Sequence, residues 1–410
     1  MTRTTRRGVL AGAGATLLAA PALAQRQVTL RIAYPAWDST DQQQAVTAIF
    51  AEYERQNPGT RIEILSLPFP VLRQRLVVAA RAGDPPDIAY CDGRWVPEMA
   101  VPGLLADLTQ AAAQLDRADW HAEPWRGSTV RGRIFGIPDR IDPWLVYCNA
   151  EHFERAGITS FPTTMDGLAE TAKKLTGNGI HGWGLIGAKD ASLISRYINF
   201  LYAHHGDLLT PDGQRSAFAQ PEGVAALRFY TDLLVKYQAA QPSAIANGLN
   251  DVNQLFQAGR VSMIIDGPWR MGALRDQAPN LRWSLAQLPP AAGKSPRFLT
   301  SSWYYTVFRG GRQQPDAVRF VEFLLRPENM ARSVVTLPAR KSAARAPRFA
   351  APIYAPWLAA VPYTVPFTPT DKFTEIADVV GDAVQQVLAG RSTADAAAAE
   401  ASRRIDALVG

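Results

Sequence analysis

Near the N-terminus, segments with the pattern of strands alternate with segments with the pattern of helices, and this order restricts the fold more than any other feature. Apolar side chains largely alternate with polar ones over residues 28–34 and 61–67, as in strands with one buried face. Apolar residues recur at helical spacing over residues 46–53 and 72–80, and residues 87–90 form a third strand-like run. Because strands joined through helices run in the same direction, we expect an α/β fold with a parallel sheet covered by helices.

A second α/β region is expected over roughly residues 150–300. Helical patterns cover residues 165–175, 194–204 and 224–236, and strand-like runs cover residues 182–186 and 261–265. The chain has 410 residues, of which 47% are hydrophobic and 9% aromatic. This composition excludes intrinsic disorder, and the length exceeds one ordinary domain. Two lobes are therefore expected.

The first 24 residues have the form of an export signal. Residues 1–7 are basic without an acidic residue, residues 8–20 are apolar and small, and Ala22-Leu23-Ala24 is a signal-peptidase type of site. Residues 5–10 resemble a twin-arginine (Tat) signal, although Val9 stands where phenylalanine is commoner. An ordinary Sec signal with a chance arginine pair is the alternative. Either signal predicts cleavage near Ala24 and a periplasmic location.

The charge of the chain does not indicate a nucleic-acid partner. The formal charge is +6, from 43 basic and 37 acidic residues, but Arg3, Arg6 and Arg7 lie in the export signal. The remaining 40 basic residues leave a charge of +3, and they are spread along the chain. A nucleic-acid-binding protein concentrates basic residues on one face, so this class is excluded.

One uncharged segment is long enough to be considered as a membrane-spanning helix. The longest stretch without a charged side chain, residues 349–370, contains five prolines, so we expect an extended connection there instead of a membrane helix.

Cys91 and Cys148 lie in strand-like runs without a CxxC neighbour. Free, buried thiols are expected, and a disulfide of an exported protein is the alternative.

Six short motifs occur in an order that is known from one protein family. They are residues 83–88 (GDPPDI), 104–108 (LLADL), 134–153 (IFGIP through YCNAEHF), 256–269 (FQAGRVSM with DGPW), 337–342 (LPARKS) and 388–393 (LAGRST). In this order they resemble the family 1 extracellular solute-binding proteins of ABC importers, the maltose-, sugar- and glycerol-phosphate-binding group. The chain departs from the family at residues 301–305 (SSWYY), where the family often has a glycine-rich crossing.

The resemblance implies a two-lobed periplasmic binding protein fold. Each lobe would have a mainly parallel sheet with flanking helices, and crossing strands between the lobes would act as hinges. Carried onto this sequence, lobe one covers residues 26–144 plus 304–345, and lobe two covers residues 145–303 plus 346–410. The hinges would lie at residues 142–148, 302–307 and 342–350.

Polar and aromatic residues that follow the expected strands are the candidate ligand contacts, because ligands of open α/β sheets bind at the carboxyl ends of strands. Trp37 and Asp38 follow the first strand as a sugar-type pair, although Asp38 can instead only cap a helix. Asp92 and Arg94 follow the third strand. The first crossing is dense in polar groups, which are Asp139, Arg140 and Asp142.

The family resemblance adds three contacts. It implies that Trp269 stacks on the ligand and that Arg340 reaches into the cleft. Trp303 is a case similar to Trp269, and core packing is the alternative for both tryptophans. Lys189, Asp190 and Arg196 are weaker candidates in lobe two. The chain has 36 Arg and only 7 Lys, so a local group of arginines is weak evidence for an anionic ligand.

The implied function is the periplasmic substrate-binding component of an ABC importer. The protein would be a monomer that captures a carbohydrate or related polyol derivative by hinge closure and delivers it to the permease. The ligand can be neutral or anionic, such as a sugar acid, sulfosugar or glycerophosphate. No cofactor or metal ion is expected, because the sequence has no HExxH, zinc-type Cys/His spacing or GxSxG motif. An exported hydrolase of sugars or sugar esters is the alternative, since the chain has many carboxylates.

Overall fold

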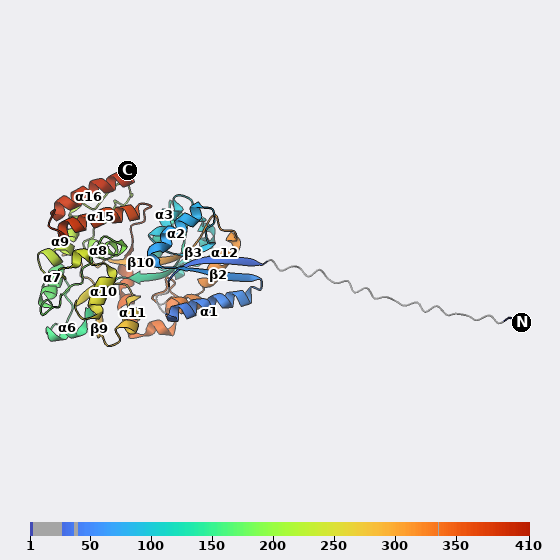
Figure 1. The fold of residues 1–410 in the computed structure, drawn as a ribbon, viewed down its shortest axis with the longest axis horizontal. Helices are drawn as coiled ribbons and strands as arrows, with labels where there is room; N and C mark the ends of the chain where they lie inside the picture. Colours follow the sequence, from blue (N-terminus) through green and yellow to red (C-terminus); the bar gives the residue numbers. More distant parts are fainter. Residues whose placement is uncertain (3–26, 37–39, 335) are drawn as a thin grey trace.

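The computed structural model describes residues 1–2, 27–36, 40–334 and 336–410. The export signal, apart from its first two residues, and the candidate contacts Trp37 and Asp38 lie outside the described residues. The helices form two groups, on either side of the long strand β10 (Phe298–Val307), which lies between them (Figure 1).

The larger sheet contains the three strands expected near the N-terminus. These are β1 (Val28–Pro35), β2 (Thr60–Leu67) and β3 (Ile88–Asp92), and β1 pairs in parallel with both others, as predicted. The sheet order is β11-β10-β3-β1-β2, and β6 (Ile137–Pro143) also pairs with β10. β10 runs antiparallel to β3 and β6 and parallel to β11 (Thr364–Pro366). Strands from distant parts of the chain therefore complete this sheet.

Of the elements in the described residues, seven α-helices and a small hairpin belong to the same group. The hairpin is β4 (Thr129–Val130) with β5 (Arg133–Ile134). The helices are α1 (Thr40–Gln56), α2 (Phe69–Arg81), α3 (Trp95–Ala100), α4 (Thr109–Ala113), α5 (Ala122–Ser128), α12 (Gln314–Leu324) and α13 (Pro327–Ser333).

The sheet of the second group differs from the expectation. It has the order β8-β7-β9, with β8 at Met263–Asp266, β7 at Leu145–Asn149 and β9 at Trp283–Ala286. Both pairings are antiparallel, so the expectation of a mainly parallel sheet is wrong here. β8 and β9 run in the same direction and are joined through α11 (Arg270–Gln277), as in a parallel unit. An earlier strand, β7, lies between them and runs the opposite way, which periodicity along the chain cannot show.

Helices surround this second sheet. They are α6 (Ala150–Arg155), α7 (Met165–Lys174), α8 (Ala191–Ala203), α9 (Pro221–Val235), α10 (Leu249–Gln257), α14 (Ala355–Ala360), α15 (Phe373–Leu388) and α16 (Ala394–Val409). None of the helices in the described part of the chain is long and apolar enough to cross a membrane.

The proline-rich segment 349–370 is not extended, in contrast to the expectation. It consists of short 3₁₀ turns, the six-residue helix α14 and the strand β11. Pro352, Pro356 and Pro362 each stand in the first turn of one of these short helices. Proline is tolerated there because the first amide groups of a helix have no intrahelical partner. The prolines therefore start short helices and also prevent them from growing into one long helix.

The buried apolar side chains form two separate clusters, one for each group of elements. The first cluster draws on residues 28–137 and 303–343, and the second on residues 141–299, on Leu337 and on residues 349–405. Along the chain, membership therefore changes between Ile137 and Ile141 and again between Leu299 and Trp303. We refer to the two groups as lobe one and lobe two. The boundaries and hinges given above stay predictions.

Both cysteines are free and buried, as the sequence predicted. Burial raises the pKa of the Cys91 thiol to about 12, and it raises the pKa of the Cys148 thiol as well. The thiolate is the reactive form. We therefore expect iodoacetamide at mildly alkaline pH to leave the native protein unlabelled and to label two thiols after unfolding in urea, as measured by mass spectrometry. Rapid labelling of the native protein would contradict this prediction.

Candidate ligand-binding site

A cavity of about 440 Å³ lies between the two apolar clusters and is lined from both lobes. Lobe one contributes residues at the ends of β1 and β3 and from β6, β10 and the starts of α1 and α2. Lobe two contributes the N-terminal turns of α8 and one face each of α10 and α11. The size is that of an ordinary small-molecule pocket.

Three predicted contacts form one row across the larger sheet. In the register of the strands, Trp303 of β10 pairs with Asp92 of β3 on one side and with Arg140 of β6 on the other. All three side chains line the cavity. Ala36, which follows β1, lines it as well. The carboxyl ends of the parallel strands β1 and β3 therefore meet at the cavity, as the sequence argument expected.

Asp92 and Arg94 form a two-pronged ion pair at the cavity wall. Arg94 donates from Nε to Oδ1 and from Nη2 to Oδ2 of Asp92, both at 2.8 Å. Its Nη1 also donates to Ser195 Oγ of α8 at 3.2 Å, and the guanidinium lies 4.9 Å from the ring centre of Phe367. Arg94 therefore connects the end of β3 in lobe one with lobe two.

Arg140 lies between an acidic residue and an aromatic ring. Its Nε is 2.9 Å from Asp142 Oδ2, and its guanidinium lies 5.0 Å from the ring centre of Trp303. Asp142 and Asp139 are buried and do not line the cavity. Asp139 instead accepts a hydrogen bond of 2.7 Å from the hydroxyl of Tyr90, which does line it. The two carboxylates therefore contact the residues of the wall.

Asp139 makes the stability of the fold depend on pH. Burial raises its pKa to about 6, although the Tyr90 hydrogen bond and Arg140 act to lower it. Aspartate in an unfolded chain has a pKa of about 3.9, so this group contributes stability below about pH 4 that is lost as the pH rises through about 6.

We expect Asp139→Asn to reduce this dependence, because an amide mimics the protonated carboxyl group. The free energy of unfolding, measured in urea between about pH 4 and about pH 7, should fall less with rising pH in the variant than in the wild type. Equal slopes for the two proteins would show that Asp139 titrates normally.

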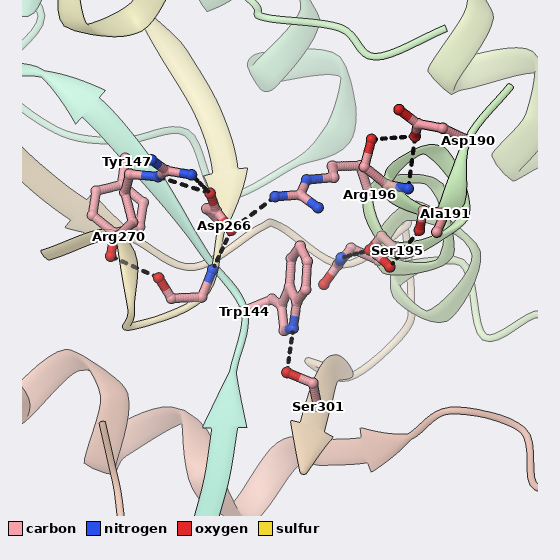
Figure 2. A network of polar contacts seen from close by, with 12 residues as sticks. Trp144, Tyr147, Asp190, Ala191, Ser195, Arg196, Asp266, Arg270 and Ser301 are labelled. Atoms are coloured by element: carbon pink, nitrogen blue, oxygen red, sulfur yellow. Dashed lines mark hydrogen bonds and ion pairs between the residues drawn. The ribbon is translucent and has the colours of Figure 1, made fainter. Parts of the chain in front are cut away.

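On the wall of lobe two, one buried carboxylate holds two arginines. Asp266, at the end of β8, accepts hydrogen bonds of 2.9 Å from Arg196 of α8, from Arg270 of α11 and from the backbone N–H of Gly267 (Figure 2). Burial by itself would raise the pKa of Asp266, but the two guanidinium groups hold it below its ordinary value. Both arginines line the cavity, so Asp266 fixes two cations at this wall.

Among the residues that the structure describes, three tryptophans line the cavity, of which Trp144 and Trp303 are buried and Trp269 is partly exposed. Trp303 is covered by Tyr90 and Arg140, and Trp144 is covered by Arg196 and donates to Ser301 Oγ (Figure 2). A Cβ atom added at Gly267 would lie only 2.1 Å from Cζ3 of Trp269. The ring of Trp269 therefore lies directly on the backbone of Gly267, and part of it stays accessible.

The other predicted residues lie elsewhere. Arg340 does not line the cavity, in contrast to the expectation. Its Nε donates to Asp119 Oδ2 at 2.6 Å and its Nη1 to the carbonyl of Leu325, so its guanidinium is held within lobe one. Asp190 caps the start of α8, and Lys189 pairs with Asp382. The ligand contacts of Trp37 and Asp38 stay predictions.

A row of amide side chains on α10 was not among the contacts predicted from the sequence. Asn250, Asn253, Gln254 and Gln257 all line the cavity. Their spacing of three, four and seven residues places them on one face of a helix, and this signal is visible in the sequence. In the described residues, no group of three or more His, Cys, Asp or Glu side chains could hold a metal ion.

Comparisons with known proteins agree with this geometry. A protein of Brucella abortus (strain 2308) that is named only as a binding protein is 26% identical over 368 residues, which are 87% of this chain and 88% of that protein. An ABC transporter solute-binding protein from Thermotoga lettingae TMO, solved with bound alpha-D-tagatose, is 27% identical with a TM-score of 0.83, covering 94% of this chain and 100% of that one.

The fold is also shared with maltose-bound T. maritima MalE3, with 24% identity, a TM-score of 0.81 and coverage of 93% of this chain and 100% of that chain. The family of bacterial extracellular solute-binding proteins matches residues 36–331. This chain therefore belongs to the bacterial extracellular solute-binding proteins and has their two-lobed fold.

Proposed function

We propose that the protein binds a carbohydrate or related polyol in the cavity between its lobes and delivers it to the permease of an ABC importer. The observation that carries this proposal is the make-up of the cavity, in which fixed carboxylate–guanidinium pairs face a partly exposed tryptophan ring. A sugar presents hydroxyl groups at its edge and C–H groups on its faces. It therefore needs hydrogen-bond donors, acceptors and an aromatic surface at once.

The arrangement of the chain supports binding by closure of the lobes. β6 and β10 each contribute apolar side chains to both clusters, and the chain passes directly from β6 to β7 in lobe two. A small number of crossing segments of this kind acts as a hinge. The contact of Arg94 with Ser195 Oγ joins the lobes at the cavity, so it would form as the lobes close.

The ligands of two similar proteins indicate which class of ligand to expect. The Thermotoga lettingae protein is bound with a monosaccharide, and T. maritima MalE3 is bound with a disaccharide. Arg196 and Arg270 share the single carboxylate of Asp266, so an anionic sugar derivative also fits this wall. We propose that the protein is exported to the periplasm by the signal in residues 1–24 and acts there as a monomer.

The test is a binding and turnover assay with the purified mature protein. Neutral mono- and oligosaccharides, a polyol and sugar acids are added one at a time. Tryptophan fluorescence and calorimetry follow binding, and chromatography follows products. We expect saturable binding of one ligand per chain without products. Absence of binding to every member of the panel would refute the proposal, and sustained product release would instead support the hydrolase.

A further inference from the structure

α10 presents uncharged amide groups to the cavity along its whole length. Asn250, Asn253 and Gln254 line the cavity, and Gln257 continues the row at the end of the helix. The opposite face of α10 carries Val252 and Phe256 into the core of lobe two. Seven residues separate the first amide from the last, which corresponds to about 10 Å along the helix axis.

The first three of these amides have free hydrogen-bonding groups. Within the described part of the chain, the side chains of Asn250, Asn253 and Gln254 form no hydrogen bond, whereas Gln257 donates to Oε1 of Gln277 at 2.8 Å. Each primary amide offers two donors and one acceptor oxygen without a charge. This set matches hydroxyl and ether oxygens, and it gives an anion no favourable charge.

The amide row covers more of the wall than one sugar ring can reach. At its start, Gly248 lies beside Asp190, the cap of α8, and at its end Gln257 contacts Gln277 in the last turn of α11. Trp269, in contrast, immediately precedes the first turn of α11. A single ring stacked on Trp269 would leave part of a row of about 10 Å without a partner.

We propose that the amide row of α10 is a second subsite, which binds further hydroxyl-bearing rings of a ligand whose first ring stacks on Trp269. This inference rests on the proposed sugar-binding function and adds to it that the cavity distinguishes ligands by length. A chain of two or more linked neutral rings binds more tightly than a single ring, because the longer ligand can contact Trp269 and the amide row at the same time.

The first test compares ligand lengths in the full mature chain. Glucose, maltose and maltotriose form one series, and N-acetylglucosamine and diacetylchitobiose form another. For the series that binds, we expect the longer sugar to bind at least about fivefold more tightly to the wild type. The double variant Asn253→Ala/Gln254→Ala loses this preference, so that it binds the longer sugar and the monosaccharide with similar affinity. Gln214→Ala, an exposed amide outside the cavity, is the matched control.

The second test measures contact directly and does not depend on the effect of deleting amides. Both native thiols are buried, so a cysteine introduced at an exposed position is the main reactive group. In Gln254→Cys, the longer sugar should slow labelling by iodoacetamide. Labelling of Ala258→Cys, at an exposed position next to α10 that does not line the cavity, should stay unchanged.

The outcomes separate this inference from the function on which it rests. If the wild type binds a sugar but the double variant keeps the length preference, or Gln254→Cys is not protected, the subsite is refuted and sugar binding stands. If no sugar in either series binds the wild type, the subsite is refuted, and the panel that also contains a polyol and sugar acids decides separately on the proposed function.

Discussion

Replacing Asp266 with alanine is expected to lower the free energy of unfolding by about 3–5 kcal/mol, because it leaves buried cations without a counter-charge. Arg196 and Arg270 are nearly as buried as the carboxylate, and both depend on it. The change also removes the acceptor for the backbone N–H of Gly267. Urea-induced unfolding, followed by circular dichroism, measures the loss.

Two further variants distinguish the buried charge from other effects of the substitution. Asp266→Asn keeps the size and one acceptor oxygen, so we expect a smaller but still substantial loss of stability. Glu170→Ala breaks an ion pair with Lys173 on the surface of α7, where both side chains are about half exposed or more, and should cost less than about 1 kcal/mol. A loss for Asp266→Ala as small as that for Glu170→Ala would contradict the structural role of the carboxylate.

Replacing Trp269 with alanine is expected to weaken ligand binding by about 1–3 kcal/mol, because the variant loses the aromatic surface on which a sugar ring stacks. The effect should appear in calorimetry with the sugar that binds the wild type most tightly. Trp283→Ala is the matched control, since Trp283 is also partly buried in lobe two but packs on Tyr147 away from the cavity. It should leave the affinity nearly unchanged.

Gly267→Ala tests the same contact without removing the ring. The added Cβ atom would meet the ring of Trp269 at 2.1 Å, so the ring must move away from its place at the cavity wall. We expect weaker binding and a changed tryptophan emission spectrum for this variant. If both Trp269→Ala and Gly267→Ala bind with wild-type affinity, Trp269 is a packing residue and does not contact the ligand.

Much of the fold and part of the site could be predicted because the relevant signals are local in the chain. Alternating apolar residues predicted β1 and β2, and the helical segment between them predicted that they run in parallel. The ion pairs of Asp92 with Arg94 and of Arg140 with Asp142 join residues two positions apart, the first at the end of β3 and the second within β6. The amide row of α10 likewise follows from local spacing in the sequence, although it was not among the predicted contacts.

Contacts between segments that are distant in the chain could not be predicted from local sequence patterns. The acceptor of Arg340 is Asp119, 221 residues away along the chain, and this ion pair holds the guanidinium outside the cavity. The insertion of β7 between β8 and β9 makes the second sheet antiparallel although the connection through α11 is of the parallel type. Trp303 is covered because the sheet places Tyr90 of the neighbouring β3 and Arg140 of β6 against its ring.

The physical reason for this division is the range of the forces involved. Hydrogen bonding and side-chain periodicity within a strand or helix depend on neighbouring residues, so the amino-acid order already specifies these elements. Which surfaces then meet depends on burying apolar area over the whole chain, against the entropy of closing long loops. The sequence therefore specified the α/β elements and the short-range ion pairs. The packing of the lobes selected which of the candidate residues face the ligand cavity.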